Sequence, residues 1–311
     1  MTPRQRALDA VSPGGRLGVE LGPLNRPLIR RGDGDILYAD HRSTDDLRAK
    51  YAGHDSVDGP GAQSIVEVDL VLEHQSLAEA LGARAPVDYI VASHVLEHIP
   101  DPLGWLNELA AVLREDGVIF LAVPDKRFTF DFHRRPSTTG DLVGHHIAGA
   151  KIASPTQVFD YVSRVAKVDP RAVWAGTERD PGPIFEGQLP RALEDARNVA
   201  AHGSYYDAHC TVYTPVSFLA VFREVIELGL IPFEIARIDP TARNTIEFFV
   251  TLRKRADASP AARAAATPRL DPRQHGELPE VPVRGIGRRL ALALRMLRTG
   301  SIRRYETGQH G

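Results

Sequence analysis

Cysteine is almost absent from this chain, which has one, Cys210, among its 311 residues. A single cysteine excludes an internal disulfide framework and an all-cysteine metal site, and a lone cysteine is more often inert packing than a nucleophile. Long apolar runs are also lacking, since no stretch approaches the roughly eighteen residues that cross a bilayer. The N-terminal segment has no apolar core of the signal-peptide type. From these absences we expect a cytoplasmic protein.

Acidic and basic residues nearly balance, with 40 Asp and Glu against 38 Lys and Arg, but they are unevenly placed. Residues 255–311 hold eleven arginines and five acidic residues, a balance of +6, which leaves residues 1–254 at −8. Affinity for nucleic acid depends on neutralising its phosphates, so an acidic body argues against nucleic acid as the main partner. The remaining composition, 43% hydrophobic and 25% charged, is typical of a globular protein.

The segment VASHVLEHIPD contains the pattern H-x-x-E-H in His94, Glu97 and His98. In one group of zinc proteases, two histidines of such a motif hold the metal on a helix and the glutamate activates water. Here the apolar run 88–93 predicts a strand, and Pro100 follows the motif at once, so little room is left for a helix. No third ligand is evident downstream, although a zinc site needs one. The sequence therefore predicts no metal, and a loop between a strand and a helix.

Short apolar runs that predict strands alternate with segments of helical spacing along the first 255 residues. The last two of these strands are joined by a short loop, which predicts an antiparallel pair. Alternation of this kind indicates an α/β fold with a doubly wound, mostly parallel sheet. The expected strands are 16–22, 35–40, 64–71, 87–93, 117–125, 233–239 and 247–255, and the expected helices are 101–116, 154–168 and 214–230.

In a doubly wound sheet, ligands bind beside the carboxyl ends of the strands. Gly22 lets the backbone turn tightly there and approach a ligand. Asp40 follows it by about the spacing at which a dinucleotide-binding fold places the carboxylate for ribose hydroxyls, and Asp69 suits an exocyclic amine or a ring edge. Taken together, the strand ends predict a pocket for an adenosine-bearing cofactor. Its candidate residues are Glu20, Gly22, Asp40, Asp69, Ser93 and His94.

Over about residues 16–254, this order resembles the class I S-adenosylmethionine-dependent methyltransferases. DYIVASHVLEHIPDPLGWLNELAAVLREDGVIFLAVPD looks like the fourth and fifth strand region of the small-molecule group called type 11. VELGPLNRPL, DLRAKYAGH, VEVDLV, VPDKRFTFDFHRRPSTTGDLV and HCTVYTPVSFLAVF are similar to bacterial methyltransferase-domain proteins associated with surface-polysaccharide genes. The resemblance implies a seven-stranded, Rossmann-like methyltransferase fold and S-adenosylmethionine as the cofactor.

The resemblance also gives each strand end a part in holding that cofactor. One departure lies in the first loop, where the family commonly has two or three glycines and this chain has Pro23, Leu24 and Asn25 after Gly22. Because asparagine tolerates left-handed backbone geometry, we expect Asn25 to preserve the turn. The resemblance implies that Glu20 and Gly22 line the methionine end of the cofactor and that Asp40 binds the ribose. It also implies that Asp69 lies on the adenine side and that Ser93 and His94 flank the sulfonium.

Residues 126–213 are too many for an ordinary connection, which predicts an inserted cap that selects the substrate. Methyl transfer to oxygen or nitrogen can require a base that removes a proton from the acceptor. We expect a small-molecule or glycan acceptor, methylated at oxygen, the glycan being suggested by the narrower resemblance alone. The candidates for the base are Asp125, Asp131, His145, His146 and His209.

Two other functions stay open at this point. A nicotinamide-dependent reductase or epimerase uses a similar sheet, but no tyrosine here has lysine four residues on, and the fingerprint G-x-G-x-x-G is missing. A catalytically silent, methyltransferase-like binding module is supported by the incomplete glycine loop. Binding of S-adenosylhomocysteine distinguishes an enzyme from both.

The C-terminal part differs in character from the methyltransferase-like residues 1–255. Residues 256–283 are rich in Ala and Pro and lack apolar periodicity, which predicts a flexible linker. Residues 284–305 combine a leucine stripe with seven arginines, which is typical of a basic amphipathic helix. Such a helix either contacts the inner face of a membrane peripherally or packs back on the acidic body.

Overall fold

The structure is a computed structural model that describes residues 1–52 and 61–275. Within these residues, seven strands form one sheet in the order β3-β2-β1-β4-β5-β7-β6. Strand β7 runs antiparallel to both of its neighbours, and the pairs among β1 to β5 are parallel. The predicted doubly wound, mostly parallel sheet is therefore confirmed, as is the antiparallel pair. The strands are β1 (Leu17–Leu21), β2 (Asp35–Asp40), β3 (Leu70–Val71), β4 (Val87–Ser93), β5 (Leu113–Pro124), β6 (Phe233–Asp239) and β7 (Glu247–Lys254).

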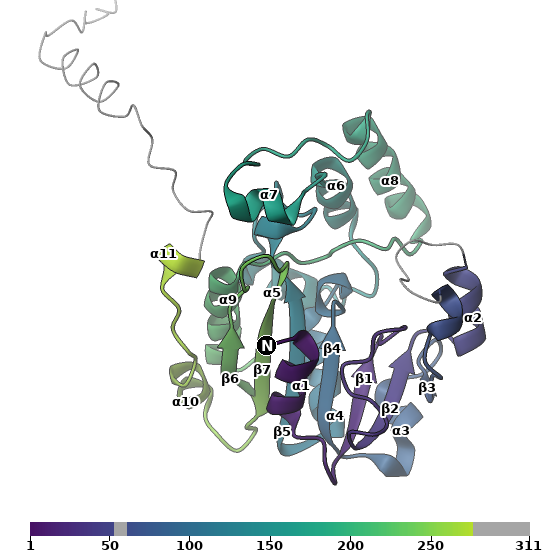
Figure 1. Ribbon diagram of the computed structural model, residues 1–311, viewed down its shortest axis with the longest axis vertical. Coiled ribbons are helices and arrows are strands. Elements are labelled where there is room, and N and C mark those ends of the chain that lie inside the picture. The colour runs from purple at the N-terminus through teal and green to yellow at the C-terminus, as the bar shows by residue number, and fades with distance from the viewer. Residues whose placement is uncertain (53–60, 276–311) are drawn as a thin grey trace, which may run out of the picture. The chain divides into compact units, whose positions relative to one another are not determined.

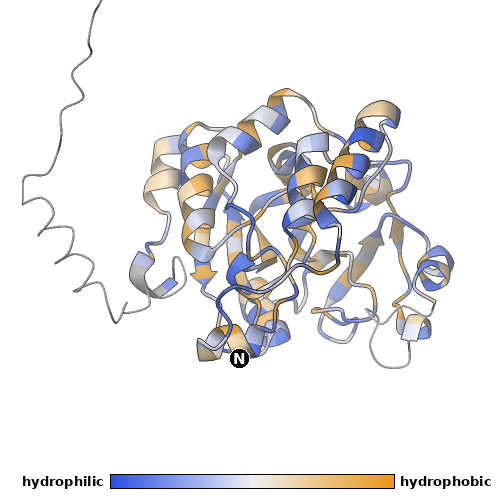
Figure 2. Ribbon diagram, turned by 90° about the horizontal axis from the view of Figure 1, so that it is seen from above, coloured by the Kyte–Doolittle hydropathy of each residue, from blue (hydrophilic) through white to orange (hydrophobic). Residues whose placement is uncertain are grey.

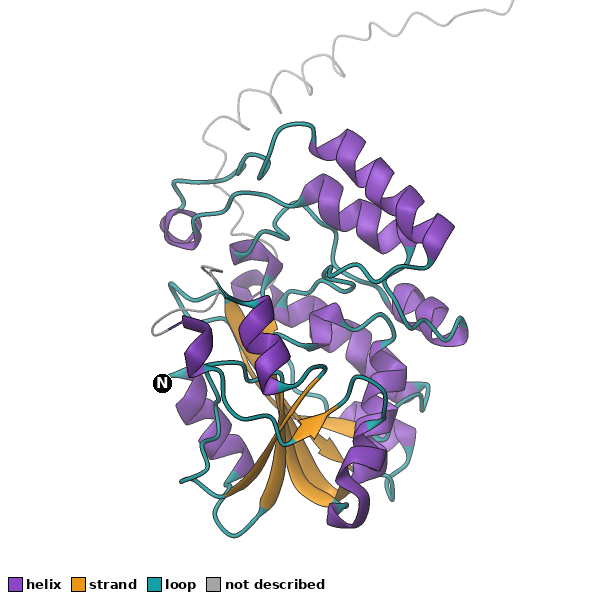
Figure 3. Cartoon of the chain, turned by 90° about the vertical axis from the view of Figure 1, so that its right-hand side faces the viewer, coloured by secondary structure: helices purple, strands orange, loops and turns teal. Residues whose placement is uncertain are grey.

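Helices cover both faces of this sheet, and a further group lies beyond the strand ends (Figure 3). They are α1 (Pro3–Val11), α2 (Thr44–Lys50), α3 (Leu77–Leu81), α4 (Pro102–Val112), α5 (Thr139–Ile147), α6 (Pro155–Arg164), α7 (Pro170–Ala175), α8 (Gln188–His202), α9 (Pro215–Glu227), α10 (Pro260–Ala265) and α11 (Pro272–His275). Helices α4, α6 and α9 begin as their sequences predict, because the capping side chains of Asp101, Ser154 and Thr214 are each followed by proline.

The side chains of the central strand β4 divide between two hydrophobic cores. Ile90 and Ala92 belong to a large core that α4 and α9 cover, in which Phe222 is fully buried. Tyr89 and Val91 point to the other face and join a smaller core beneath α1. Successive side chains of a strand point to opposite faces, and burial of both faces fixes the register of the sheet. The carboxyl ends of the strands are thereby held in place.

The helix expected over 101–116 is shorter than predicted. It ends at Val112, and strand β5 already begins at Leu113. Leu113 has helical spacing from Leu109, which is why the sequence pattern favours a longer helix. In the structure, however, Leu113 pairs with Val87 of β4 and is 1% exposed, so sheet pairing prevails over helical periodicity.

The third strand also differs from the expected range of 64–71, since β3 has two residues. Asp69 precedes the strand, and its carboxylate accepts a hydrogen bond from the backbone N–H of Tyr38 at 2.8 Å. The Asp69 side chain thus accepts the backbone N–H of Tyr38, which the backbone of β3 would accept if that strand were longer.

Within residues 126–213, which we expected to form the cap, helices α6, α7 and α8 lie over the strand ends (Figure 1), whereas α5 packs against α4 and α9. The prediction included α6, over 154–168, and missed α5, α7 and α8. Helix α8 buries the small residues Ala192, Ala196 and Val199 among many charged ones, so its apolar signal is weak. Polar and apolar residues alternate along the cap helices in Figure 2. The cap has a small core of its own, consisting of Ala153, Val158, Val162, Ala192, Val199, Ala208 and Cys210.

The flexible linker predicted over 256–283 does not hold for its first part, because α10 packs on α9 and β6. Arg263 of α10 is 5% exposed and donates hydrogen bonds to the carbonyls of Arg255 and Ile231. Residues 276–283 and the predicted basic helix over 284–305 lie outside the described residues. Among the described residues, no helix is long and apolar enough to span a membrane.

Candidate functional site

Gly22, Asp40 and Ser93 end neighbouring strands at one edge of the sheet, as the sequence predicts. The N–H of Gly22 donates to the carbonyl of Ala39 at 2.9 Å, which joins the ends of β1 and β2. Gly22 has φ of +63°, and a Cβ there would lie 3.3 Å from a methyl of Val95. Both the left-handed backbone and the close neighbour favour glycine at this position. The edge therefore keeps an open backbone surface, which fits a bound cofactor.

Asp40 is the last residue of β2 and is 7% exposed. One of its oxygens accepts the backbone N–H of His41 at 2.7 Å and lies 2.6 Å from Nδ1 of the same residue. A mostly buried carboxylate beside a glycine turn has the chemistry that ribose hydroxyls require. Its contact with the cofactor remains a prediction.

Glu20 anchors the loop that follows β1. It is 1% exposed and accepts the backbone N–H groups of Leu28 at 2.7 Å and Ile29 at 2.9 Å. Burial raises the pKa of Glu20 to about 7, although the two hydrogen bonds oppose the rise. In this loop the left-handed residue after Gly22 is Leu24, with φ of 45°, and not Asn25 as we expected. Contact of Glu20 with the methionine end of the cofactor remains a prediction.

Asp69 is held by two groups of the protein. Its carboxylate accepts the N–H of Tyr38 at 2.8 Å and both its oxygens lie 2.9 Å from Nη2 of Arg31. These bonds tie the segment before β3 to β2. A role on the adenine side of the cofactor remains a prediction.

His94 follows β4 with a left-handed backbone, φ 54°, and carries its ring toward two carboxylates. Its Nε2 lies 2.6 Å from Oε2 of Glu247, and its Nδ1 lies 3.4 Å from Oε1 of Glu97. Burial disfavours the charged ring, but the two carboxylates outweigh it and raise the pKa of His94 to about 10. The cofactor edge therefore ends in an imidazolium balanced by carboxylates.

A pocket of about 580 Å³ begins at His94 and extends beneath the cap. Its wall combines the ends of β4 and β5, the start of the cap, the region before α7 and the segment before α9. Most of the lining is apolar or aromatic, and five of the lining side chains are ionisable. The lining residues are His94, Glu97, His98, Pro124, Phe128, Thr129, Phe130, Ala166, Lys167, Val168, Pro170, Ile184, His209 and Ile246.

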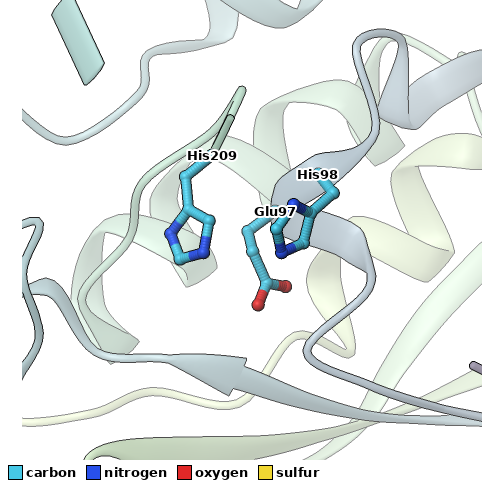
Figure 4. A group of neighbouring side chains, drawn as sticks. All are labelled: Glu97, His98 and His209. Carbon is cyan, nitrogen blue, oxygen red and sulfur yellow. The ribbon is translucent and has the colours of Figure 1, made fainter. Parts of the chain in front are cut away.

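Glu97, His98 and His209 gather in one wall of this pocket (Figure 4). They offer ligand atoms that all lie within 4.8 Å of one another. The Nδ1 of His98 lies 2.8 Å from Oδ1 of Asp207, and the Nδ1 of His209 lies 2.6 Å from Oδ2 of Asp131. Each imidazole is therefore oriented by a carboxylate on the ring side that faces away from Glu97.

Backbone bonds bring His209 to the motif from a distant part of the chain. The carbonyl of Glu97 accepts the N–H of Cys210 at 2.6 Å and that of Thr211 at 3.2 Å. The segment before α9 is thus fastened to the turn Leu96–His98. We expected no third ligand near the H-x-x-E-H motif, and the tertiary structure brings His209 beside Glu97 and His98, where the three side chains could hold a metal ion.

A family match covers more than half of the chain: residues 35–225 match the protein family described as Methyltransferase domain. The chain belongs to this methyltransferase family. A methyltransferase of Mycolicibacterium smegmatis, named as S-adenosylmethionine-dependent, is 30% identical over 135 residues, which are 40% of this chain and 49% of that protein. The chain thus spans about half the length of this curated relative. These matches confirm the predicted methyltransferase domain and S-adenosylmethionine as its cofactor.

Several solved structures match most of this chain at low identity. An S-adenosylmethionine-dependent methyltransferase from Listeria monocytogenes is 14% identical, with a TM-score of 0.38 over 81% of this chain and 98% of that one. A Rhodobacter sphaeroides protein named as a zinc-dependent alcohol dehydrogenase is 11% identical, with a TM-score of 0.42 over 81% and 88%. Neither likeness bears on the function of this methyltransferase domain.

The three predicted catalytic residues of the methyltransferase have different surroundings. Asp125 is fully buried, pairs with Arg127 at 2.6 Å and accepts the hydroxyl of Thr241 at 2.6 Å, so its oxygens are used within the protein. His145 lies on α5 and is not among the pocket residues. His209 lines the pocket. Of the three, His209 alone is placed to meet an acceptor there.

Sequence reasoning missed three residues that shape the methyltransferase pocket. Glu97 and His98 were identified as a motif, but given no function once a zinc helix was excluded. Glu247 was overlooked, although an available signal points to it: an antiparallel last strand places its first residue at the carboxyl edge of the other strands. Cys210 is buried, and burial raises the pKa of its thiol to about 12, which agrees with the expected inert role.

Proposed function

We propose that this protein transfers a methyl group from S-adenosylmethionine to a hydroxyl of a small-molecule or glycan acceptor bound in the cap pocket. The observation that carries this proposal is the position of the pocket. It begins at His94, the residue after Ser93, and Ser93 belongs to the strand edge that fits the cofactor. Donor and acceptor sites are therefore adjacent in the chain and in space.

Three residues would hold the cofactor. The backbone at Gly22 would approach it closely, Asp40 would accept hydrogen bonds from its ribose hydroxyls, and Ser93 would contact it at the end of β4. When bound, S-adenosylmethionine supplies the methyl group, whose bond to sulfur breaks as its bond to the acceptor oxygen forms. The protein's own task is to place that oxygen in line, and such positioning provides much of the rate enhancement of a displacement. The cap supplies the other wall that makes this placement possible.

The apolar lining suits an acceptor with a flat or ring-shaped apolar face. Phe128 stacks on Trp174 with ring centroids 4.0 Å apart, which fixes one aromatic surface of the pocket. Phe130 lies against His209, with centroids 4.7 Å apart. Aromatic surfaces of this kind bind the carbon faces of rings, while a few polar groups fix orientation. At the ionisable side, the wall of Glu97, His98 and His209 is where the acceptor hydroxyl would lose its proton.

A second cap pocket of about 780 Å³ supports a larger acceptor than a single ring. It lies between α6 and α8 and shares Phe130 and Ile184 with the first pocket. An acceptor could therefore extend from one pocket into the other. The combined pocket supports a glycan acceptor over a small metabolite. A glycan acceptor would also agree with the resemblance to the type 11 and surface-polysaccharide-associated proteins.

Calorimetric titration of the full chain with S-adenosylhomocysteine tests the proposal first. Binding at micromolar to sub-millimolar concentration is expected, and its absence would favour the silent binding module. A second experiment offers the chain labelled S-adenosylmethionine and fractionated bacterial extract. Label appearing in a glycan or small-molecule fraction supports the proposal, whereas label in protein or nucleic acid contradicts it.

A further inference from the structure

We propose that Glu97, His98 and His209 form a binding site for a divalent transition-metal cation in the wall of the acceptor pocket. Cation binding itself follows from the side chains alone. The use of the cation to hold the acceptor oxygen rests on the proposed methyl transfer. The inference reverses our prediction from the sequence, which excluded a metal because it found neither room for a helix that holds both histidines nor a third ligand.

The donor set is that of a metal site. Two imidazoles and one carboxylate, with ligand atoms within 4.8 Å of one another, come together from the turn Leu96–His98 and the segment that contains His209 (Figure 4). Nitrogen and carboxylate ligands in this proportion suit first-row divalent cations such as Zn²⁺, Co²⁺ or Mn²⁺. The arrangement differs from the protease motif, since His94 is not one of the three and Glu97 and His98 lie in a short 3-10 helix and not in an α-helix.

The second observation is the way both imidazoles are held. Asp207 accepts at Nδ1 of His98, and Asp131 accepts at Nδ1 of His209. A carboxylate at one ring nitrogen fixes the tautomer with its proton there and leaves the lone pair of Nε2 for a metal. Asp131 is in turn fixed by Arg134 at 2.8 Å. Metal-binding histidines in proteins are commonly oriented in this way, and here both are.

The third observation is the state of Glu97. The residue is 1% exposed, and neither carboxylate oxygen has a hydrogen-bond partner among the described residues. His94 lies 3.4 Å from one oxygen as an ion pair, without hydrogen-bond geometry, while its other nitrogen is bound to Glu247. A buried carboxylate requires compensation. A cation between Glu97 and the two imidazoles supplies it.

Three protein ligands leave coordination positions open, as in catalytic metal sites. All three ligands line the acceptor pocket, so an open position faces the acceptor. Binding to a cation lowers the pKa of a hydroxyl, whose proton is then released to water as the oxygen joins the metal. The acceptor class that suits this site has two neighbouring oxygens, such as the vicinal hydroxyls of a sugar.

Cation binding is tested on the full chain after treatment with a chelator, with Co²⁺ as the probe. We expect one Co²⁺ per chain, and visible absorption bands of nitrogen- and oxygen-coordinated Co²⁺. Glu97→Gln and His209→Ala should each weaken binding by about 100-fold or more, because loss of a ligand should exceed the roughly 10–100-fold cost of losing a group that only orients a ligand. His74→Ala is the control, since His74 is a histidine on the segment after β3 whose side chain is 87% exposed. It should leave Co²⁺ binding unchanged.

His98→Ala gives a further variant should Glu97→Gln fail to fold, because the His98 side chain is 35% exposed. Equal Co²⁺ binding by wild type and the ligand variants, or no binding by any of them, overturns the inference. Failure of the proposed methyl transfer can be distinguished from failure of the metal site. Co²⁺ binding without methyl transfer would leave the metal site standing, whereas chelator-resistant methyl transfer by a chain that binds no Co²⁺ would leave only the methyltransferase.

Discussion

The Nε2 atom of His94 lies 2.6 Å from Oε2 of Glu247, which links the end of β4 to the first residue of β7. The link spans β5, which lies between these two strands in the sheet. Because β7 is antiparallel, its first residue reaches the edge where the parallel strands end. The position of His94, which lines the pocket beneath the cap, therefore depends on a residue of the last strand.

Replacing Glu247 should weaken this link. Glu247→Ala leaves the His94 imidazolium without its closest partner, and hydrogen bonds to charged groups contribute about 1.5–3 kcal/mol. His94 is 36% exposed, so water recovers part of this and we expect a loss of about 1 kcal/mol. Urea unfolding measures the change. Glu67→Ala is the control. Glu67 forms an ion pair with Arg48, but its side chain is 69% exposed, so its loss should change the stability little. Equal effects would contradict the assignment.

Asp40→Ala should reduce affinity for S-adenosylhomocysteine while the domain stays folded. Charge-assisted bonds to ribose hydroxyls contribute roughly 1.5–3 kcal/mol each, so the dissociation constant should rise at least about tenfold. Calorimetric titration measures it. Asp45→Ala changes a neighbouring aspartate that is 95% exposed and should leave the affinity as it is. A folded Asp40→Ala protein with unchanged affinity would show that the ribose site lies elsewhere.

Gly22→Ala should affect both folding and cofactor binding. The substituted residue keeps φ of +63° only at a cost of about 1–2 kcal/mol, and its Cβ meets Val95 at 3.3 Å. Thermal unfolding and titration with S-adenosylhomocysteine measure the two effects. Gly14→Ala serves as the control, because a Cβ there meets no atom within 4 Å. Should Gly22→Ala bind as tightly as wild type, the open edge at Gly22 would have no part in holding the cofactor.

Glu20 should make stability depend on pH. Its pKa in the folded protein is about 7, above the usual 4.5, so the folded state binds more protons between these values. Stability therefore falls as the pH rises from about 4.5 to 7 and stays at the lower level above that. At 1.36 kcal/mol per pK unit, the change between pH 5.5 and 8 is about 2 kcal/mol. Urea unfolding at these two pH values measures it, and Glu20→Gln should remove it. Parallel behaviour of variant and wild type would refute this assignment.

The C-terminal segment gives a prediction from sequence alone. Seven arginines over 284–305, each contributing roughly 1 kcal/mol near an anionic surface, are sufficient for peripheral membrane binding. The full chain should sediment with anionic liposomes at low salt, and a chain ending after His275 should not, while both bind S-adenosylhomocysteine. Truncation at Arg255 is unsuitable, because Arg263 of α10 is buried against the domain. Equal sedimentation of the two chains would leave the packed-helix alternative.

The sequence alone determined much of the sheet and the cofactor edge. Strands β2 and β4 have the bounds that their apolar runs predict, and Gly22 and Asp40 lie at the strand ends where the pattern placed them. These features depend on neighbouring residues, since strand alternation and glycine turns are local properties. The local pattern was misleading where a residue pairs with a distant part of the chain. Leu113 has helical spacing, but it belongs to β5 and pairs with Val87 of β4.

Only the tertiary structure decided which side chains surround the H-x-x-E-H motif. The motif by itself is a three-residue turn, and its partners are His209, Asp207 and Asp131 from the cap. Backbone bonds from Cys210 and Thr211 to the carbonyl of Glu97 bring them there, and no periodicity in the sequence specifies such a crossing. Side chains far apart in the chain form a site only when the path of the backbone brings them together, and that path is a property of the whole fold.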